Sequence, residues 1–578
     1  MSALFHSYLC GRNAAEWLIQ MMDMMKLYQL WIDKTSGNMP IQEELQAICG
    51  DAPAIEDRFY RELEFGTGGL RGVLGAGTNR LNVYTVGKAT QGYSSYLKKH
   101  AKTSSVAIAY DSRINSKLFA ETAACVFAAN GITVHLYDHL MPTPSLSFAV
   151  RDLRCNGGIV ITASHNPAEY NGYKVYGADG CQITTEAAEA IQAEINKVDP
   201  FSDVQTVDFE TALREGAVVY IGEDVIDRYQ AAVSSASLLP ENVARDVAIV
   251  YTPLNGTGIS CVPRCLQEHG FTNITIPTEQ AQPDGNFPTC PYPNPEIREA
   301  LEVGLHWAEK TGSDLLLATD PDCDRVGAAV KTSEGYTLIN GNEMGVLLLD
   351  FICKMRLSNG TMPKHPVAVK TIVTTPMAAK IAAHYDVELV NVLTGFKFIG
   401  EQIGELEKRG EANRYIFGFE ESYGYLSGTF VRDKDAVNAS LLICEMFAWY
   451  KAQGKTLVDV LAELYEQYGF YRTKLLSFTF GGAAGFVRMQ ELMSELRRNP
   501  PKESAGEVVT QILDYDKHGT GLPRSNVLRF IMADGEAVVR PSGTEPKLKV
   551  YLTAAKETCR TSQEMIERLE RYFTLWAK

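Results

Sequence analysis

The sequence is short of two features: it has no long apolar run and no excess of basic residues. No stretch of about 18 apolar residues occurs among its 578 residues, so we predict no membrane-spanning helix and no membrane partner. Lys and Arg number 55 against 70 Asp and Glu, which gives a net charge of −15. A chain this acidic lacks the broad basic face that binds a phosphate backbone, so we expect no nucleic-acid partner. An anionic small molecule stays possible, because local Arg and Lys clusters can outweigh the net charge in a cleft.

The cysteines lack the spacing of a metal site or a disulfide framework. All twelve are scattered and no CxxC pair occurs. Cys261 and Cys265 could share one helix face, but no His or second pair completes a zinc site. Scattered thiols in a long chain favour a reducing compartment. The N-terminal residues also lack the cationic start and apolar run of a signal peptide, so we expect a cytoplasmic protein.

Apolar strand-like runs alternate with helix-like segments along most of the chain, which is typical of α/β domains. The candidate strands are 106–109, 134–137, 159–163, 247–251, 315–318, 367–370 and 416–417. Three times a strand runs into a turn of similar composition, in AIAYDSR, AIVYTPLNGTG and TIVTTPMAAK. This repetition suggests three α/β units of related design. After about residue 470 the pattern changes to strand, turn and strand, which indicates an α+β module.

The length suggests three to five domains at about 100–200 residues each. We predict an N-terminal extension over 1–40, whose first twenty-odd residues should be peripheral to the fold. The predicted α/β domains follow over 41–225, 226–338 and 339–468, and the α+β domain covers 469–578.

The stretch GIVITASHNPAEYNGYKVYG, residues 158–177, brings polar side chains to the end of an apolar strand. Ser164 and His165 follow that strand, and Lys174 comes ten residues after the serine. Open α/β sheets keep their ligands at the carboxyl ends of strands, so Ser164 is a candidate nucleophile. A Ser/Asn/Pro turn that merely ends the strand is equally compatible with this stretch taken alone.

A second stretch, SDLLLATDPDCDRVGAAV, ends an apolar strand in alternate carboxylates. Asp320, Asp322 and Asp324 are followed by Arg325. Carboxylates so placed can converge on one divalent cation, and ligation by oxygen alone suits Mg²⁺ or Mn²⁺. A calcium loop is disfavoured because its sixth position requires Gly, where Arg325 stands. The alternative is a solvated acidic turn.

Three further stretches offer groups that would suit a sugar phosphate. FGFEESYGYLSG places Glu420 and Ser422 after an apolar run, where they could hydrogen-bond to adjacent sugar hydroxyls. RPSGTEPK, from Arg540 to Lys547, combines a guanidinium, hydroxyls and backbone N–H groups, the parts of a phosphate cradle. EFGTGGLRG brings Arg71 beside glycines that allow close backbone approach, but it is not a Walker loop. Each stretch by itself could be an ordinary turn.

Taken in order, TASHNP, DPDCDR, FEES and RPSGTEP resemble the four active-site loops of the α-D-phosphohexomutase superfamily of phosphoglucomutases and phosphomannomutases. Lesser motifs agree, namely GTGGLRG, DSR at 111–113, TGFKFIGE from Thr394 and VRDKDA from Val431. The resemblance covers about residues 65–551. It implies three related α/β domains plus a C-terminal α+β domain around a central active-site cleft.

The resemblance also implies a role for each loop. Ser164 would carry the transferred phosphate as phosphoserine. The residues implied to hold Mg²⁺, together with an oxygen of the phosphate on Ser164, are Asp320, Asp322 and Asp324. The residues implied near the transferred phosphate are Arg71, His165, Lys174 and Arg325. Lys174 is an acid–base candidate on the condition that burial and neighbouring cations lower its pKa.

Substrate binding is implied for the remaining loops. The residues that would contact the sugar are Glu420 and Ser422, with Thr394 and Gly395 in a side loop that could decide sugar preference. The residues that would bind the phosphate not undergoing transfer are Arg540, Ser542, Gly543, Thr544 and Lys547.

One departure from the family pattern concerns the general base. The phosphomannomutase/phosphoglucomutase branch has Gly-His after the sugar-loop serine, whereas Tyr423 and Gly424 follow Ser422 here. The α-phosphoglucomutase branch has a lysine in a loop like VRDKDA, which indicates Lys434 as a substitute. The chain length and FGFEESYGY resemble most the branch of long-chain bacterial α-phosphoglucomutases and mammalian phosphopentomutase.

The resemblance therefore implies a Mg²⁺-dependent mutase that interconverts glucose 1-phosphate and glucose 6-phosphate through a glucose 1,6-bisphosphate intermediate, which also serves as activator. Pentose and mannose phosphates remain alternative substrates, and a variant could make the bisphosphate itself. A phosphatase with a nucleophile at Asp320 is disfavoured, because the haloacid-dehalogenase pattern requires Gly-Thr after its D-x-D. A non-catalytic sugar-phosphate sensor is disfavoured because every expected catalytic position is filled.

Overall fold

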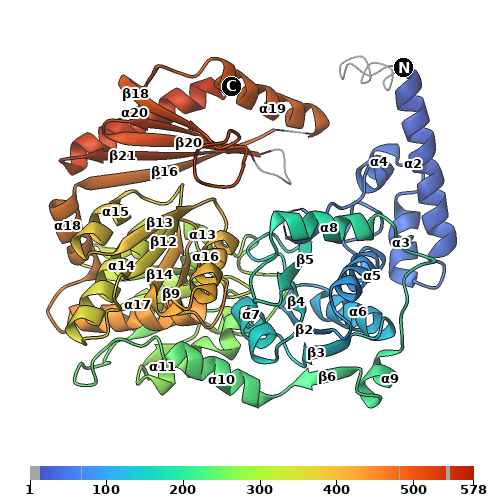
Figure 1. Cartoon of the computed structure of the whole chain (residues 1–578), viewed down its shortest axis with the longest axis horizontal. Coiled ribbons are helices and arrows are strands. Elements are labelled where there is room, and N and C mark those ends of the chain that lie inside the picture. Colours follow the sequence, from blue (N-terminus) through green and yellow to red (C-terminus); the bar gives the residue numbers. More distant parts are fainter. Residues whose placement is uncertain (1–13, 67, 481, 542–546, 578) are drawn as a thin grey trace.

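The computed structural model describes residues 14–66, 68–480, 482–541 and 547–577 of the chain. These residues form four sheets, each built from a separate stretch of the sequence (Figure 1). We call the units built on these sheets domains I to IV in chain order. All seven candidate strands lie in or overlap strands of these sheets. The expected architecture of three α/β domains followed by an α+β domain is therefore confirmed.

Domain I has a sheet with strand order β1-β5-β4-β2-β3-β6, in which β5 runs antiparallel to β4 and β1. Strand β2 is buried on both faces: Val106 and Ile108 pack into one core cluster, and Ala107 and Ala109 pack into another. This explains its unbroken apolar sequence, since a strand covered by helices on both faces has no polar side. The elements are β1 (Gly69–Val73), α5 (Val83–His100), β2 (Ser105–Tyr110), α6 (Ser116–Ala129), β3 (Thr133–Tyr137), α7 (Thr143–Asp152), β4 (Gly157–Ile161), β5 (Tyr170–Gly177), α8 (Thr185–Ile195), α9 (Phe209–Arg214) and β6 (Val218–Ile221).

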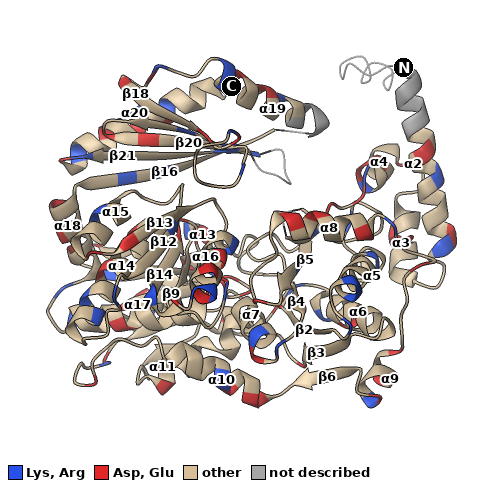
Figure 2. Ribbon diagram, in the orientation of Figure 1, with Lys and Arg blue, Asp and Glu red and all other residues tan. Residues whose placement is uncertain are grey.

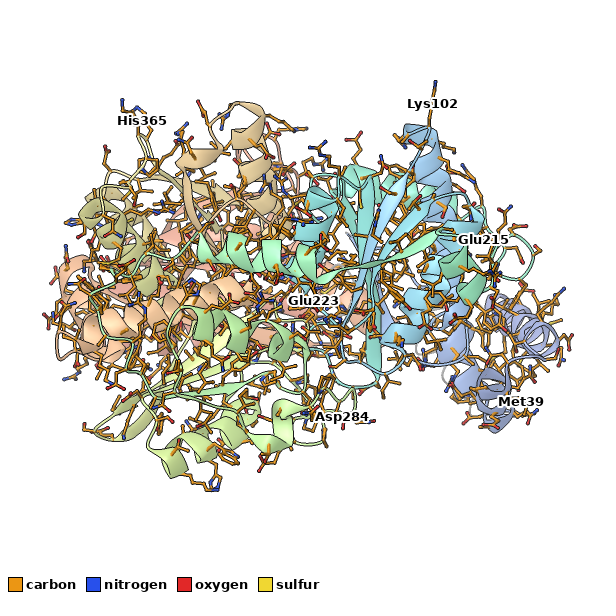
Figure 3. The ribbon with its side chains drawn as sticks, turned by 90° about the horizontal axis from the view of Figure 1, so that it is seen from below. Met39, Lys102, Glu215, Glu223, Asp284 and His365 are labelled. Carbon is orange, nitrogen blue, oxygen red and sulfur yellow. The ribbon has the colours of Figure 1, made fainter. Side chains whose placement is uncertain are left out.

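Domain II has the strand order β11-β10-β9-β7-β8, with β10 antiparallel to β9. Its helix α10 leads from domain I toward domain III, and Glu223 marks the start of this helix in Figure 3. The elements are α10 (Glu223–Ser234), β7 (Ile249–Thr252), α11 (Val262–Glu268), β8 (Ile274–Thr275), α12 (Thr278–Ala281), α13 (Arg298–Thr311), β9 (Leu315–Thr319), β10 (Val326–Thr332) and β11 (Gly335–Ile339).

Domain III has the strand order β13-β12-β14-β15, with β15 antiparallel to β14. The elements are α14 (Gly341–Ser358), β12 (Val367–Thr371), α15 (Met377–His384), β13 (Glu388–Val392), α16 (Phe396–Lys408), β14 (Tyr415–Glu420), β15 (Gly424–Leu426), α17 (Ala436–Lys451) and α18 (Leu457–Tyr468).

One arrangement of three strands recurs in domains I, II and III. A first strand lies parallel to a second, and the second is followed by an antiparallel third strand: β2, β4 and β5, then β7, β9 and β10, then β12, β14 and β15. The three similar turns in the sequence follow the first strand of each set. The expected relationship among the three units is therefore visible as a shared strand order.

Domain IV is an antiparallel sheet, β16-β21-β20-β19-β18-β17, with α19 and α20 packed on one face. Its other face meets domain III, where Val538 and Tyr551 pack with Ile372, Val373 and Leu393. The elements are β16 (Phe470–Thr479), α19 (Gly482–Arg498), β17 (Glu503–Ser504), β18 (Glu507–Asp514), β19 (Leu528–Met532), β20 (Gly535–Pro541), β21 (Lys547–Lys556) and α20 (Cys559–Trp576).

From residue 14 onward, three described helices precede domain I: α2 (Ala14–Lys34), α3 (Met39–Ala47) and α4 (Ala52–Phe59). Trp31 of α2 is 1% exposed, and its ring makes edge contacts with those of Phe59, Tyr84 and Phe201. Two of these partners belong to domain I, so the second half of α2 is packed onto that domain. A division at residue 40 would cut α3, and residues 1–13 of the expected extension lie outside the described residues.

The other domain divisions remain a proposal supported by where the elements end. Strand β6 ends at Ile221, β11 at Ile339 and α18 at Tyr468, close to the predicted divisions at 225, 338 and 468. Lys and Arg are interspersed with Asp and Glu along the helices of all four domains (Figure 2). Among the described helices, none combines the length and apolar character needed to cross a bilayer.

We expect Trp31→Ala to loosen the three N-terminal helices from domain I. Removing a buried Trp side chain costs about 3–5 kcal/mol, enough to expose these helices by local unfolding. Amide hydrogen exchange over 21–60 should accelerate at least tenfold. The matched control is Leu30→Ala, because the neighbouring side chain is 39% exposed and should leave exchange unchanged. Equal exchange in the two variants would contradict the packing described.

Candidate active site

Three of the predicted site loops leave the carboxyl end of a central parallel strand and lead into its antiparallel neighbour. Ser164 lies between β4 and β5, Asp320 between β9 and β10, and Glu421 between β14 and β15. Loops at this edge of a sheet are where α/β folds keep their ligands. The shared strand order therefore brings the same kind of loop from each domain toward one place.

Ser164 is held in a strained backbone conformation at the centre of this region. Its φ is +51°, which is uncommon for a residue with a Cβ. The side chain is buried, and its Oγ donates a hydrogen bond to Asp320 Oδ2 at 2.7 Å. Oγ also lies 3.1 Å from His165 Nδ1. The serine of domain I therefore contacts the acidic loop of domain II directly.

Arg113 holds the serine loop in this conformation. Its guanidinium donates to the backbone carbonyls of Ser164 at 2.6 Å, Pro167 at 2.8 Å and Tyr170 at 2.9 Å, and also to that of Asn166. Four carbonyls on one planar group fix the path of the loop, because the fork cannot rotate without losing several bonds.

The sequence analysis found the DSR motif but assigned no role to Arg113. Its ion pair with Asp111 is 3.5 Å long, and its guanidinium lies 5.1 Å from the ring centroid of Phe287 in domain II. The position of the motif could have indicated this role: DSR follows β2, which is the parallel neighbour of β4, and the serine loop follows β4.

Asp320, Asp322 and Asp324, here called the acidic triad, lie together and are buried. Their carboxylate oxygens come within 4.8 Å of one another. Asp322 Oδ1 and Asp324 Oδ1 are buried and have no hydrogen-bond partner. Burial, and then the two neighbouring carboxylates, raise the pKa of Asp320 well above its ordinary value. Buried oxygens that lack donors, crowded with like charge, fit a bound divalent cation.

Two lysines from different domains reach the acidic triad. Lys174 Nζ of β5 lies 2.8 Å from Asp322 Oδ2 and 3.4 Å from Asp324 Oδ2. Lys434 lies in the loop before α17 in domain III, and its Nζ lies 2.6 Å from Asp324 Oδ2. The structure thus brings both lysine candidates to one carboxylate.

The pKa of each lysine is raised. Burial by itself would lower the pKa of Lys174, but the adjacent carboxylates outweigh burial. The same balance, with Asp324 and Asp433 as partners, raises the pKa of Lys434. The condition stated for Lys174, a lowered pKa, is therefore not met in this arrangement. Both side chains are charged ammonium groups that can donate hydrogen bonds and protons.

His165 lies beside the serine, and two arginines act electrostatically on this histidine. Arg325 pairs through Nη1 with Glu296 of the loop before α13, while its Nε is buried without a hydrogen-bond partner. Arg71 of β1 donates to Asn166 Oδ1 at 3.2 Å. Burial, and then Arg325 and Arg71, lower the pKa of His165 well below its usual value, so the ring is neutral at pH 7. Sequence reasoning missed Glu296, which carries no motif signal beyond a Pro-rich loop.

In the sugar loop, the two glutamates differ in environment. Burial, only partly offset by Lys434, raises the pKa of Glu420 to about 7. The next residue, Glu421, instead accepts hydrogen bonds from Thr371 Oγ1 at 3.3 Å and Thr374 Oγ1 at 3.4 Å. Burial raises the pKa of Glu421 as well, but among the described residues hydroxyl donors are found for Glu421 and not for Glu420. Half-buried Ser422 follows two residues after Glu420.

The side loop of domain III provides a further polar atom. Thr394 Oγ1 is buried without a hydrogen-bond partner. The following Gly395 is the N-cap residue of α16 and has a φ of +118°, a conformation that a residue with a Cβ adopts only under strain. These two positions are therefore suited to a hydroxyl-bearing ligand and to a tight backbone turn.

The loop of domain IV that was predicted to bind phosphate is described only at its two ends. Arg540 lies near the end of β20 and Lys547 begins β21, whereas Ser542, Gly543 and Thr544 lie outside the described residues. Lys549 of β21 interacts electrostatically with Glu296 and Arg325, besides Arg540. Domain IV thus presents positive charge to the region where the other loops meet.

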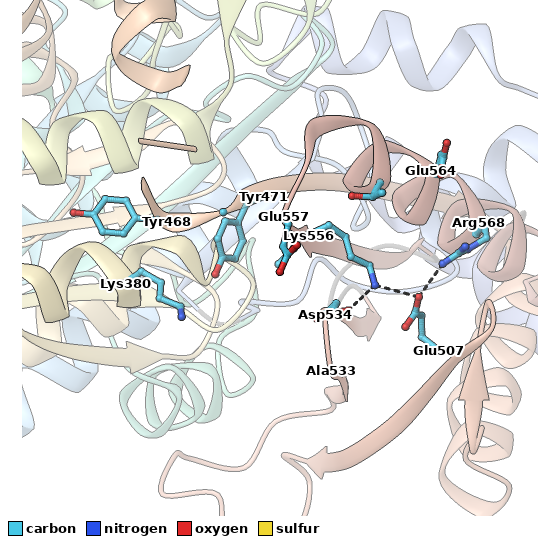
Figure 4. Close-up of a pocket in the computed structure, with 13 residues that line it drawn as sticks. Lys380, Tyr468, Tyr471, Glu507, Ala533, Asp534, Lys556, Glu557, Glu564 and Arg568 are labelled. Carbon is cyan, nitrogen blue, oxygen red and sulfur yellow. Dashed lines mark hydrogen bonds and ion pairs between the residues drawn. The ribbon is translucent and has the colours of Figure 1, made fainter. Parts of the chain in front are cut away.

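A polar groove of about 750 Å³ lies elsewhere, between domains III and IV (Figure 4). Lys380 and Tyr468 line it from domain III, and Glu507, Asp534 and Lys556 line it from domain IV. Lys556 Nζ is paired with Asp534 at 2.6 Å and Glu507 at 3.5 Å. The described lining residues include none of the predicted site residues, so the groove is separate from the candidate site.

The chain matches four domains of one family over most of its length. They are described as Phosphoglucomutase/phosphomannomutase alpha/beta/alpha domain I over residues 62–201, domain II over 227–335, domain III over 340–468 and C-terminal domain over 487–567.

Curated relatives agree along nearly the whole chain. A phosphoglucomutase of Staphylococcus aureus strain MSSA476 is 36% identical over 557 residues, covering 94% of this chain and 97% of the relative. A phosphoglucomutase of Staphylococcus haemolyticus is 38% identical over 510 residues, covering 86% and 91%.

Solved structures share the fold. A putative phosphomannomutase from Thermus thermophilus aligns with a TM-score of 0.67 at 22% identity, covering 89% of this chain and 99% of that one. The open form of a Paramecium exocytosis-sensitive phosphoprotein, parafusin, aligns with a TM-score of 0.66 at 19% identity, covering 89% and 95%. With its four domains matched in order and its curated relatives aligned over 86–94% of its length, the chain belongs to the phosphoglucomutase/phosphomannomutase family.

Proposed function

We propose that this protein is a Mg²⁺-dependent phosphoglucomutase that interconverts α-D-glucose 1-phosphate and glucose 6-phosphate. The observation that carries the proposal is the contact between Ser164 Oγ and Asp320 Oδ2 at 2.7 Å, which joins a buried hydroxyl to the acidic triad. The near full-length identity to phosphoglucomutases favours glucose phosphates over mannose or pentose phosphates. The scattered cysteines support a cytoplasmic location.

The reaction begins with a phosphoryl group on Ser164 Oγ. The group passes to the 6-hydroxyl of glucose 1-phosphate: the P–Oγ bond breaks, a P–O6 bond forms, and in the balance of the step the proton of the 6-hydroxyl ends on Ser164 Oγ. The product is glucose 1,6-bisphosphate, which turns round in the cleft and returns its 1-phosphoryl group to Ser164. Glucose 6-phosphate then leaves, and the serine is phosphorylated again.

The acidic triad would hold the divalent cation, since its carboxylates are buried and close together and two of their oxygens, Asp322 Oδ1 and Asp324 Oδ1, have no hydrogen-bond donor. When bound, a Mg²⁺ ion neutralises charge on the phosphoryl oxygens as a Lewis acid. The protein's own cations supply the rest of the electrostatic stabilisation. Lys174 and Lys434 form ion pairs with the triad. In the reaction each lysine is proposed to donate a hydrogen bond to an oxygen that gains negative charge.

The remaining residues bind and orient the substrate. Arg325 would exchange its partner Glu296 for a phosphate oxygen, because a bidentate guanidinium contact with phosphate is strong. Glu420 would accept a hydrogen bond from a sugar hydroxyl. Arg540 and Lys547 are proposed to bind the phosphate that is not transferred, with the predicted Ser542, Gly543 and Thr544. Such remote contacts supply binding energy and orientation for the reacting end.

The first prediction concerns the nucleophile and the sugar. With Mg²⁺ and catalytic glucose 1,6-bisphosphate, glucose 1-phosphate should exceed mannose 1-phosphate and ribose 1-phosphate at least tenfold in kcat/KM, about 1.4 kcal/mol at the transition state. Ser164→Ala should lose turnover and covalent phosphate, since the acceptor oxygen is gone. Ser95→Ala, on α5 in the same domain, should retain both. A preference for ribose 1-phosphate would make a pentose phosphate the substrate. An active Ser164→Ala would refute the mechanism.

The second prediction concerns the cation. Chelation should abolish turnover and Mg²⁺ should restore it. Asp322→Asn should raise the Mg²⁺ concentration needed for half-maximal activity at least tenfold, because a charged ligand becomes neutral. Asp138→Asn, an exposed carboxylate of domain I, should leave that concentration unchanged. An unaltered Mg²⁺ requirement in Asp322→Asn would remove this residue from the cation site.

The third prediction concerns the serine loop. Arg113→Lys keeps the charge but cannot reach the four carbonyls that the guanidinium binds, so the loop should shift. A displacement near 1 Å can cost about a hundredfold in rate, and we expect kcat to fall ten- to a hundredfold. Arg151→Lys also removes a guanidinium contact to a carbonyl, that of Asp179, and should keep wild-type kcat. Full activity in Arg113→Lys would show that the clamp is dispensable.

A further inference from the structure

A buried tyrosine of domain I contacts the loop of domain III that carries Lys434. Tyr176 Oη donates to Asp433 Oδ2 at 2.7 Å, and both side chains are withdrawn from water. Tyr176 lies on β5 two residues after Lys174, so the two side chains point to the same face of the sheet. One strand thus reaches the acidic triad through a lysine and the Lys434 loop through a tyrosine.

The contact continues to the ammonium group of Lys434. The second oxygen of Asp433, Oδ1, accepts from the backbone N–H of Lys434 at 2.8 Å and lies 3.5 Å from its Nζ. That Nζ is in turn 2.6 Å from Asp324 Oδ2. A displacement of the Asp433 carboxylate therefore changes both the backbone and the charged end of Lys434.

The loop is also held on either side of this contact. Tyr229 Oη of α10 donates to both oxygens of Asp435, at 3.1 and 3.0 Å. The backbone N–H of Arg432 donates to Ser147 Oγ at 2.9 Å. These two contacts fix the ends of the loop, and the tyrosine of β5 fixes the carboxylate between them.

Tyr176 is suited to act as a permanent donor. Burial, and then the carboxylate of Asp433, raise the pKa of its hydroxyl well above the ordinary value, so the proton stays on the tyrosine. The ring packs in the core cluster shared with domains II and III. Replacing Tyr by Phe would therefore leave the ring in place and remove only the hydrogen bond.

We propose that Tyr176 is a positioning residue, which through Asp433 holds Lys434 Nζ against the acidic triad. This inference rests on the proposed mutase function. It makes β5 the element that sets both lysines: Lys174 directly, and Lys434 across the boundary between domains I and III. The effect is expected on the transition state rather than on substrate binding, because Tyr176 is fully buried and acts on Lys434 only through Asp433.

The test is Tyr176→Phe, assayed with glucose 1-phosphate, Mg²⁺ and glucose 1,6-bisphosphate. We expect kcat to fall about tenfold while KM stays within about twofold, since only the placement of one ammonium changes. The matched control is Tyr173→Phe on the same strand and the opposite face, whose hydroxyl meets Thr90 Oγ1 at 3.2 Å. It should keep wild-type kcat. An unchanged kcat in Tyr176→Phe, or a loss confined to KM, would overturn the proposal.

A second variant guards against a folding defect. Asp433→Ala removes the acceptor of the same hydrogen bond and should show at least the same loss of kcat. Because both changes break one link, the kcat of the double variant should be no more than about twofold below that of the less active single variant. Losses that multiply would mean that the two residues act independently and would overturn the proposal.

A structure of Tyr176→Phe gives a readout that does not depend on activity. The Lys434 Nζ to Asp324 Oδ2 distance of 2.6 Å should lengthen, and an unchanged distance would contradict the inference. The two proposals can fail separately. A wild-type protein that does not interconvert glucose phosphates refutes the proposed function. An active wild type, an inactive Ser164→Ala and a fully active Tyr176→Phe refute only the positioning role.

Discussion

The burial of three carboxylates at one point is the constraint on which the rest of the site depends. Buried charge is costly unless it is paired or bound to a cation, and the acidic triad brings three such charges within 4.8 Å. Arg325 of domain II offsets part of this charge, and the other groups come from other domains: the Ser164 hydroxyl and Lys174 from domain I, and Lys434 from domain III. Domain II therefore cannot complete the site alone, and the chemistry of the site depends on how the other domains are placed against it.

The repeated strand order explains how three domains can meet this constraint. Each domain ends its central strand in a loop that turns back into an antiparallel neighbour. The loop is short and anchored at both ends, so its side chains have little freedom. Where anchoring by strands is not enough, arginine adds it: Arg113 binds four carbonyls around the strained serine. Rigid loops are needed because catalysis by electrostatic stabilisation requires groups that are already in place.

Much of the architecture could be predicted because it depends on local pattern. The apolar runs identified strands such as β2 and β9, and the ordered loop motifs identified the family. The chain's N-terminal helices were harder, since Trp31 is a core residue only because Phe59, Tyr84 and Phe201 surround it. The acid–base role of Lys174 depended on a pKa lowered by burial and neighbouring cations. Spacing along the chain could not show that carboxylates lie beside this lysine, and they raise its pKa instead.

By itself the sequence determined the strands, the order of the loops and the kinds of groups that they carry, because these follow from spacing along the chain. Only the tertiary structure decided which groups meet. Ser164 and Asp320 are 156 residues apart yet hydrogen-bonded, and Tyr176 and Asp433 are 257 residues apart. Neither contact has a signal in composition or periodicity. Each arises from the packing of whole domains, whose relative placement depends on the summed burial of apolar surface rather than on any one motif.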